Sequence, residues 1–258
     1  FFIFTMNALI VYHNKNSIIL PYIISKFPKY TAKSRVKLTI YDYKNKEIII
    51  VIGGDGTFLR ASHLNTNIPM FGINPKPHRK VGFFTRANNL NFKKKIELIL
   101  KNDFFITKTL RLEAKINDQL IKDLCLNEIY VGHHKPYYMF NYDLSINKKT
   151  EFQRSSGVLI GTPSGSHAWI ASAGGKKLNI KSRKYQLIAR EPYISRLTSN
   201  YNLTKLNLVE KDIVKIKCKT KSVLVMDSIG KVHKLNPKDI VEISVSKHDL
   251  KIISFQKS

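Results

Sequence analysis

The sequence has few cysteines and no long apolar run. Cys125 and Cys218 are its two cysteines, and neither has a metal-ligand or redox partner at a useful spacing. We therefore expect two buried thiols, which are typical of a reducing compartment. No run of about 18 apolar residues occurs, so no membrane-spanning helix is predicted. The first residues lack the basic segment and cleavage site of a signal peptide.

Acidic residues are also scarce. The chain has 18 Asp and Glu against 44 Lys and Arg, a formal net charge of +26. Such a field attracts anions. The basic residues are spread along the chain, and the largest clusters, 93–95 and 176–177, are short. A solvated basic surface caused by compositional bias and a nucleic-acid-binding patch both stay open. An anionic small substrate is compatible with either.

Strand and helix patterns alternate over the first hundred residues, which favours a parallel sheet with crossover connections. We predict an α/β domain over residues 1–103. The strands expected in it are 8–12, 36–41, 48–52 and 69–74, and the helices are 17–27, 57–64 and 91–100.

Beyond about residue 104, strand patterns dominate, and we predict a second, mostly-β domain over residues 104–235. Asn117-Asp118 and Asn147-Lys148 are typical hairpin turns. Residues 166–173 favour a short helix. The strands expected are 111–116, 142–146, 158–160 and 223–226.

Residues 48–60, IIIVIGGDGTFLR, carry the strongest functional signal. A buried strand ends at Gly53, and a helix capped by Thr57 is expected to follow. Glycines there allow positive φ and a close approach of backbone to ligand. The free N–H groups of such a turn bind phosphate. The segment therefore predicts a nucleotide or polyphosphate site, with Asp55 as its single acid.

Two further segments offer groups for a nucleotide. Asn127-Glu128 places an amide beside a carboxylate, which together can bind sugar hydroxyls and an adenine edge. Residues 161–169 combine glycines with small hydroxylated residues at a predicted helix start, and 154–157 precede them. Alone, the Asn127-Glu128 pair is more simply explained as an ordinary turn, whereas the 161–169 segment favours a ligand contact over an ordinary loop.

In this order, the segments resemble the NAD kinase family. The match comprises residues 53–60, the strand 69–74 with Gly82-Phe83 beyond it, Asn127-Glu128, and 162–175. It covers roughly residues 7–235. The Gly-Gly-Asp-Gly-Thr turn alone is shared with diacylglycerol and sphingosine kinases and, loosely, with phosphofructokinases. The ordered set is far more specific.

The resemblance implies an α/β N-terminal domain, a β-sandwich-like C-terminal domain, and a cleft between them. It implies that residues 236–258 return to the first domain. The implied reaction transfers the γ-phosphoryl of ATP, or of polyphosphate in some members, to the adenosine-side ribose 2′-hydroxyl of NAD, giving NADP. Mg²⁺ carried with ATP is the implied metal, with no metal-ligand residues expected in the protein. A homo-oligomer is expected, because family members are commonly dimers or tetramers.

Residue roles follow from the same resemblance. Asp55 matches the family's catalytic Asp, which would orient the 2′-hydroxyl and take its proton during transfer. Gly54, Gly56 and Thr57 would present backbone groups to phosphate. Arg60 could pair with a phosphate, although a solvated helix arginine is an equally simple reading.

On the dinucleotide side, Asn127 and Glu128 match the family pair that holds the ribose and adenine of NAD. The further residues implied to bind substrate are Arg154, Ser156, Thr162, Gly165, Ser166, His167, Ala168, Trp169 and Ser172.

Three positions depart from the pattern of many bacterial members. Gly-Asp-Gly is replaced at 155–157, so Ser156 stands where an acid would contact the nicotinamide end. Thr-Ala-Tyr is replaced at 167–169, and Ile229 replaces a frequent Gln. These variants are closer to the mitochondrial-type branch and leave NAD or NADH preference open. Trp169 could stack on a base or belong to the core. A cytoplasmic location is predicted, with the mitochondrial matrix or another organelle as the alternative.

Two other functions are compatible with parts of the sequence. A lipid kinase of the diacylglycerol or sphingosine type shares the glycine turn, but those chains usually continue with Asn-Glu, whereas residues 58–60 read Phe-Leu-Arg here. A basic nucleic-acid-binding protein without catalysis would not need Asp55. His133-His134 is not predicted to bind zinc, because adjacent histidines point to different sides of a strand.

Overall fold

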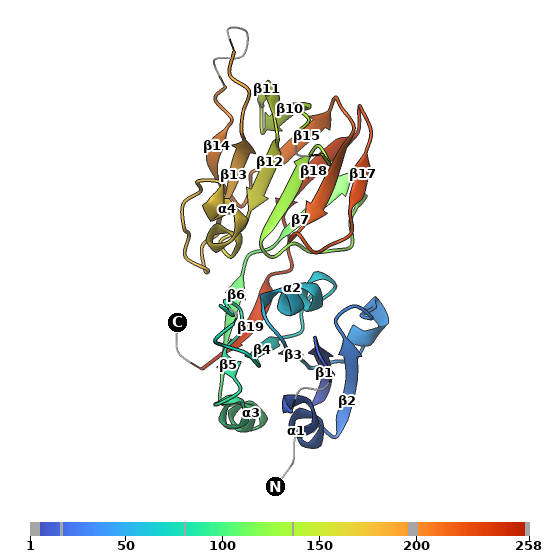
Figure 1. The fold of residues 1–258 in the computed structure, drawn as a ribbon, viewed down its shortest axis with the longest axis vertical. Helices are drawn as coiled ribbons and strands as arrows, with labels where there is room; N and C mark the ends of the chain where they lie inside the picture. Colours follow the sequence, from blue (N-terminus) through green and yellow to red (C-terminus); the bar gives the residue numbers. More distant parts are fainter. Residues whose placement is uncertain (1–5, 16–17, 80, 136, 196–200, 256–258) are drawn as a thin grey trace. The chain divides into compact units, whose positions relative to one another are not determined.

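The computed structural model describes residues 6–15, 18–79, 81–135, 137–195 and 201–255. The chain divides into two compact units, one formed by residues 1–108 with 249–258, the other by Thr109–His248 (Figure 1). The first unit is α/β and the second is built mainly of strands, as the sequence pattern predicts.

A seven-stranded sheet forms the centre of the first unit, in the order β2-β1-β3-β4-β19-β6 with β5 beside β4. The pairs among β1, β2, β3, β4, β5 and β19 are parallel. The strands are β1 (Asn7–Tyr12), β2 (Lys29–Ser34), β3 (Ile48–Ile52), β4 (Met70–Asn74), β5 (Ala87–Asn88), β6 (Phe105–Thr109) and β19 (Leu250–Ser254).

Three helices connect these strands: α1 (Ile19–Lys26), α2 (Asp55–His63) and α3 (Phe92–Leu100). Pro21 lies in the first turn of α1, where a missing N–H is tolerated. Ile19 and Ile23 of α1 and Ile96 of α3 pack with the buried faces of β1 and β3 in one core cluster. The apolar stripes of the helices therefore anchor them to the sheet.

The strand predicted over residues 36–41 is wrong. The second strand of the sheet is β2, and a 3₁₀ helix, η1 (Ile40–Tyr43), follows it. Thr39 and Asp42 cap that helix reciprocally, since the Thr39 backbone N–H donates to Asp42 at 2.9 Å. Val36 and Ile40 are exposed, so the alternating pattern has no buried face to match it.

Two six-stranded sheets make up the second unit, and their pairings are antiparallel. One sheet runs β11-β10-β15-β18-β7-β8: β7 (Leu112–Ile116), β8 (Gln119–Leu120), β10 (Phe140–Ile146), β11 (Lys149–Ser155), β15 (Val214–Cys218) and β18 (Ile240–Val245). The other runs β14-β13-β12-β9-β16-β17: β9 (Glu128–Gly132), β12 (Gly157–Gly161), β13 (Lys184–Arg190), β14 (Lys205–Val209), β16 (Ser222–Met226) and β17 (His233–Leu235).

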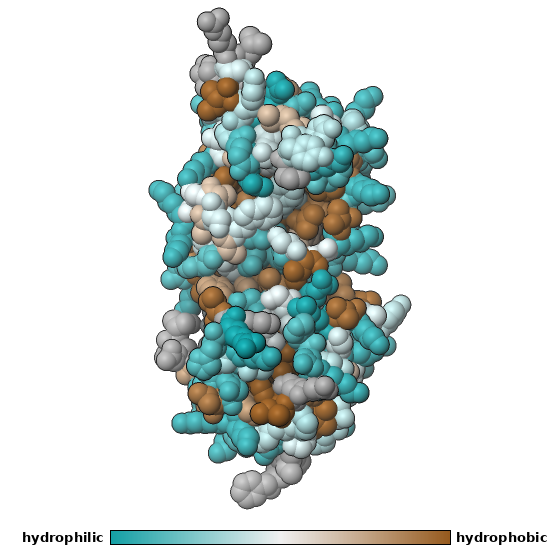
Figure 2. Space-filling view, in the orientation of Figure 1, coloured by the Kyte–Doolittle hydropathy of each residue, from teal (hydrophilic) through white to brown (hydrophobic). Residues whose placement is uncertain are grey.

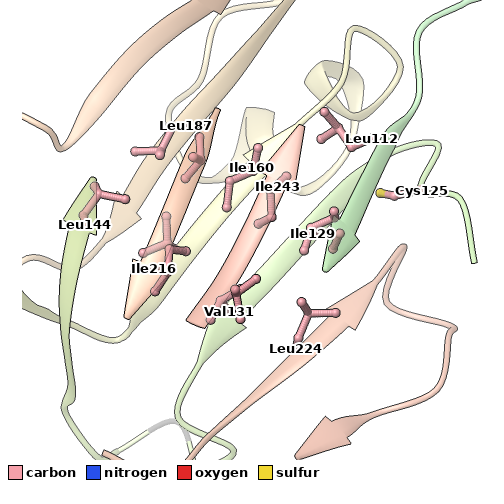
Figure 3. Packing of buried hydrophobic residues seen from close by; sticks show 14 of the residues in the cluster. Leu112, Cys125, Ile129, Val131, Leu144, Ile160, Leu187, Ile216, Leu224 and Ile243 are labelled. Atoms are coloured by element: carbon pink, nitrogen blue, oxygen red, sulfur yellow. The ribbon is translucent and has the colours of Figure 1, made fainter. Parts of the chain in front are cut away.

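Side chains from both sheets form one core. Leu144, Ile216 and Ile243 come from the first sheet, and Ile129 and Leu187 from the second (Figure 3). Strand β10 alternates buried and half-buried residues along its length, as a sheet with one covered face should. The predicted β-sandwich is therefore what the second unit forms, and the predicted turns at 117–118 and 147–148 join its hairpins.

The compact units differ from the predicted domain boundaries of 103 and 235. The first unit extends to Lys108 because β6 joins its sheet beside β19. The predicted returning segment, 236–258, is divided: β18 pairs with β15 and β7 in the second unit, and β19 pairs with β4 in the first.

Hydrophilic residues are spread over most of the face shown in Figure 2, in both units. This fits a sequence whose 44 basic residues are distributed rather than clustered. Among the described residues, no helix is both long enough and apolar enough to cross a membrane.

Candidate functional site

The glycine turn follows β3 at the carboxyl edge of the parallel sheet. Strand β1 lies between β2 and β3, so the strand order reverses between β1 and β3. Open α/β sheets bind ligands outside the carboxyl ends of their strands at such a reversal. The turn is fixed to the sheet by the Gly53 N–H, which donates to the Ile73 carbonyl at 3.0 Å.

Two details of this turn correct the sequence expectations. Its glycines have no positive φ: the described glycines with positive φ are Gly82, Gly157 and Gly174. The helix begins at Asp55 with Gly54 as N-cap, so Thr57 is not the cap. Glycine is needed at 53 for space, because a Cβ there would lie 2.5 Å from the Thr57 Oγ1.

The start of α2 presents free donors. The N–H groups of Thr57 and Phe58 donate to the Gly54 carbonyl, whereas those of Gly54 to Gly56 have no acceptor among the described residues. A Cβ built at Gly56 would meet only the Arg35 Nη1, at 3.8 Å. The fold itself therefore does not require glycine at 56, and close approach of a ligand is a physical reason for it.

Asp55 is half-buried and held by a second loop. Its Oδ2 accepts the Phe83 N–H and its Oδ1 the Phe84 N–H, both at 3.0 Å. Phe84 stacks on Phe58 of α2 at 5.2 Å between ring centroids. The Arg86 guanidinium donates to the Phe83 carbonyl at 2.8 Å, which braces the same loop. Burial lowers the pKa of Arg86, and the Asp55 carboxylate opposes that effect.

Two arginines, Arg35 and Arg60, lie near the carboxyl end of the sheet where α2 begins. Arg60 lies on α2, within the helix predicted from the sequence, and its side chain is half-buried. Arg35 follows β2 and lies over the first turn of α2, with no ion-pair partner among the described residues. Sequence reasoning missed Arg35, because only the strand order places the end of β2 near the end of β3. A guanidinium beside a helix N-terminus suits a phosphate.

In the second unit, Asn127 and Glu128 lie at the start of β9 and are almost fully buried, with exposed fractions of 9% and 4%. The Asn127 Oδ1 and the Glu128 Oε2 have no hydrogen-bond partner among the described residues. Buried polar atoms are normally paired, since leaving one unpaired costs about 1–3 kcal/mol. Two adjacent unpaired oxygens therefore indicate a place where a ligand supplies the missing donors.

The charge state of Glu128 is unusual. Burial, and secondarily the negative charge of Asp227, raise its pKa to about 8, and hydrogen-bonding groups of Ser228 and Trp169 oppose the shift. The carboxyl group is therefore protonated at neutral pH. In this form it can donate as well as accept a hydrogen bond.

The loop at 161–166 packs directly on this pair. The Thr162 hydroxyl donates to the Leu126 carbonyl at 2.5 Å, and the Ser166 hydroxyl donates to the Pro163 carbonyl at 2.6 Å. Both hydroxyls were expected to face a ligand, but in this structure they bind the protein's own backbone. A Cβ at Gly165 would lie 2.0 Å from the Asn127 carbonyl oxygen, so glycine lets the loop approach.

Helical residues follow this loop, in η2 (Gly165–His167) and α4 (Trp169–Ser172). The centroid of the Trp169 ring lies 5.3 Å from that of the Tyr130 ring. The Arg190 guanidinium also contacts Trp169, at 5.1 Å from the ring centroid. Trp169 is half-buried and packs against a small core cluster of Leu159, Ile170 and Ile188, so part of its ring belongs to the core and part is exposed. Ser172 and His167 are exposed, and Ala168 is half-buried.

Ser156 contacts Tyr130, whereas Arg154 contacts Asn141 and Tyr193. The Tyr130 hydroxyl donates to the Ser156 carbonyl at 2.8 Å. The Arg154 Nε donates to the Asn141 Oδ1 at 3.2 Å, and its guanidinium covers the Tyr193 ring at 4.8 Å. Both predicted residues are half-buried; neighbours hold the Arg154 side chain and the backbone N–H and carbonyl of Ser156.

His133 and His134 stack on each other at 4.7 Å and form part of an aromatic cluster with Tyr138. No group of three or more His, Cys, Asp or Glu among the described residues is arranged to hold a metal ion.

Comparison with known proteins assigns both halves of the chain. Residues 24–104 match the ATP-NAD kinase N-terminal domain, and residues 126–255 match the ATP-NAD kinase C-terminal domain. The lipid-kinase and nucleic-acid-binding alternatives are not favoured, because these two matches account for most of the chain.

Named relatives point the same way. A probable NADH kinase of Oryza sativa subsp. japonica is 29% identical over 229 residues, which are 80% of this chain and 70% of the relative. The NAD kinase of Methanothermobacter thermautotrophicus is 31% identical over 64% of this chain and 59% of its own length. The NAD kinase of Francisella tularensis subsp. novicida is 36% identical over 55% and 50%. The matched region thus spans 50% to 70% of the length of these relatives.

A solved structure shares the fold. The NAD kinase of Archaeoglobus fulgidus in complex with ATP superposes with a TM-score of 0.78 at 21% identity, covering 98% of this chain and 94% of that one. The two-unit architecture, together with the domain matches along the sequence, shows that the chain belongs to the ATP-NAD kinase family.

Proposed function

We propose that this chain is an NAD kinase that transfers the γ-phosphoryl of ATP, or the terminal phosphoryl of polyphosphate, to the adenosine-side ribose 2′-hydroxyl of NAD. The observation that carries the proposal is Asp55: a single carboxylate at the N-terminus of α2, at the strand-order reversal, with its two oxygens oriented by backbone donors. Phosphoryl transfer needs little covalent chemistry from the protein and depends on positioning and charge neutralisation.

Asp55 is the general base in this proposal. It orients the 2′-hydroxyl and takes its proton as the oxygen attacks the phosphorus atom. Phe83 and Phe84 fix the direction of the carboxylate through their N–H groups. Arg86 is a positioning residue, because it acts through the loop that carries those N–H groups.

The phosphates are bound by the start of α2. The free N–H groups from Gly54 to Gly56 offer donors, and the helix dipole favours negative charge there. Arg35 neutralises phosphate charge from the side of β2. Mg²⁺ prefers oxygen ligands, keeps several waters and binds chiefly to substrate phosphates. An ion carried with ATP would supply charge neutralisation for those phosphates, with Asp55 as the carboxylate at the start of α2.

The dinucleotide is held by the second unit. The Asn127 Oδ1 accepts a hydrogen bond from a ribose hydroxyl or the adenine amine, and the unpaired Glu128 Oε2 of the neutral carboxyl group donates to a ribose oxygen. Trp169 and Tyr130 add an aromatic surface beside this pair. Ser156 offers no charge for the nicotinamide end, which leaves the oxidised and reduced forms to be separated by experiment.

A coupled assay tests the proposal. Purified protein is incubated with NAD or NADH as acceptor and with ATP or polyphosphate as donor, in the presence of Mg²⁺. The expected result is NADP or NADPH formed at a rate proportional to protein. Labelled ATP with a diacylglycerol or sphingosine vesicle serves as the control acceptor. Transfer of label to lipid without dinucleotide phosphorylation would contradict the proposal.

A further inference from the structure

A buried carboxylate that the proposed reaction does not use lies at the turn after β16. Asp227 has an exposed fraction of 3%. Its Oδ1 accepts the Asn127 N–H at 2.6 Å, and its Oδ2 accepts the Leu126 N–H at 3.0 Å. The Glu128 N–H and the Cys125 thiol also donate to Oδ1, at 3.3 and 3.1 Å. Donors from four consecutive residues thus converge on one side chain.

The backbone of this turn is shaped to deliver the carboxylate. Asp227 and Ser228 have φ values of 54° and 53°, a left-handed conformation that residues other than glycine adopt rarely. The Asp227 N–H donates to the Glu128 carbonyl at 2.9 Å. The turn therefore grips the start of β9 through both its backbone and its side chain.

These hydrogen bonds position Asn127 and Glu128, the two residues with unpaired side-chain oxygens. The Asn127 Oδ1 and the Glu128 Oε2 are buried and lack partners among the described residues. From the other side, the Asn127 carbonyl accepts the Thr162 N–H at 2.8 Å. These hydrogen bonds fix the backbone at Asn127 and Glu128 from two sides, so the directions in which the two side chains leave the backbone are set before a ligand binds.

We propose that Asp227 is a positioning residue for the dinucleotide: its carboxylate gathers the N–H groups at the start of β9 and so orients Asn127 and Glu128 toward the hydroxyls of the substrate ribose. The inference rests on the proposed function. Such pre-organisation improves binding because the ordering of the site does not have to occur when the ligand arrives.

Asp227 also contributes, after burial, to the raised pKa of Glu128. Its negative charge adds to burial in raising the pKa of Glu128 to about 8. Cys125 is the other titratable group acting on this cluster, and burial raises its thiol pKa well above the ordinary value, so it stays neutral. Ser228 and Trp169 contribute hydrogen-bonding groups without charge. A protonated Glu128 donates to a ribose oxygen and loses that ability at alkaline pH.

The test compares Asp227→Asn with the wild type in steady-state assays of the full chain with NAD and ATP. The amide keeps one acceptor oxygen but turns an NH₂ group toward donors that the second carboxylate oxygen accepted, so we expect KM for NAD to rise about tenfold or more, with smaller changes in kcat and in KM for ATP. The matched control is Asp239→Asn, which removes a turn carboxylate that accepts the Asn236 N–H at 2.7 Å, away from Asn127. It should leave KM for NAD unchanged.

A pH profile separates orientation from simple loss of structure. In the wild type, KM for NAD should rise as pH passes about 8. In Asp227→Asn the rise should move to lower pH, because a neighbouring negative charge is gone. Should Asp227→Asn fail to fold, Asp227→Glu keeps the charge but displaces it by one methylene and should also raise KM for NAD.

An unchanged KM for NAD and an unchanged pH profile in the folded variant would overturn the inference. Absence of any NADP formation by the wild type would instead overturn the proposed function, so the two failures are distinguishable.

Discussion

The two units position their key carboxyl groups in opposite ways. Asp55, in the first unit, is half-buried, and backbone N–H groups bind both of its oxygens. Glu128, in the second unit, is buried, has an unpaired oxygen, and is kept neutral by burial and by Asp227. The surroundings of Asp55 fix the orientation of its carboxylate, whereas those of Glu128 set its protonation state. The comparison teaches that the proposed base and the proposed binding group, although both are carboxyl groups, differ in their surroundings in the way their different roles require.

The largest expected effect comes from removing the base. Asp55→Asn should lower kcat by about 10²–10⁴-fold, because the amide cannot take the proton of the 2′-hydroxyl. The measurement is NADP formation under saturating NAD and ATP. Asp42→Asn is the control: it removes another carboxylate of the first unit, one that caps η1, and it should leave kcat unchanged. Near-wild-type turnover of Asp55→Asn would break the distinction drawn between the two acids.

The next prediction concerns the packing that holds the second acid. In Gly165→Ala, the new Cβ would lie 2.0 Å from the Asn127 carbonyl oxygen, so backbone must move. Overpacking of this kind destabilises by about 1–3 kcal/mol, or roughly 2–12 °C in melting temperature. Thermal unfolding measures it, and KM for NAD should rise in the same variant. A melting temperature equal to that of the wild type would show that the loop does not depend on this contact.

Much of this site could be predicted from local sequence. The buried strand and glycine turn of residues 48–57 form a βα unit because periodicity and turn chemistry agree there. Asn127-Glu128 was identified as a pair and lies at the start of β9. These features depend on neighbours in the chain, which a sequence displays directly.

Other features depend on contacts that the sequence does not display. Asp227 reaches Asn127 across 100 positions, and only the pairing of β16 with β9 brings them together. Arg35 reaches the start of α2 because β2 ends at the same sheet edge as β3. The Thr162 hydroxyl was assigned to a ligand, yet it binds the Leu126 carbonyl. Tertiary partners decide such roles.

The pH dependence of stability tests whether Glu128 is held in its neutral form. Its pKa is about 8 in the folded protein against an ordinary value of 4.5, so the native state holds the proton more tightly. The stability from protonation is complete below the unfolded pKa and is lost as pH rises through about 8. Between about pH 6 and 9, the free energy of unfolding of the wild type should therefore fall by at most about 3 kcal/mol more than that of Glu128→Gln.

Melting temperatures at the two pH values give the measurement. Glu242→Gln is a suitable control, because Lys215 and Lys115 lower the pKa of Glu242 and it stays ionised throughout that range. Its pH dependence should match that of the wild type. Equal slopes for Glu128→Gln and the wild type would mean that Glu128 is not held in its neutral form.

The smallest expected change in stability tests the phosphate side. At Gly56 a Cβ has room and φ is not positive, so Gly56→Ala should keep or slightly raise stability, by about 0.5–1 kcal/mol, because alanine favours the helix. Gly53→Ala is the contrast, since its Cβ would meet the Thr57 side chain at 2.5 Å and should destabilise the first unit. If glycine at 56 serves a bound phosphate, Gly56→Ala raises KM for ATP while its melting temperature holds. An unchanged KM for ATP in Gly56→Ala would show that neither the fold nor phosphate binding requires glycine at position 56.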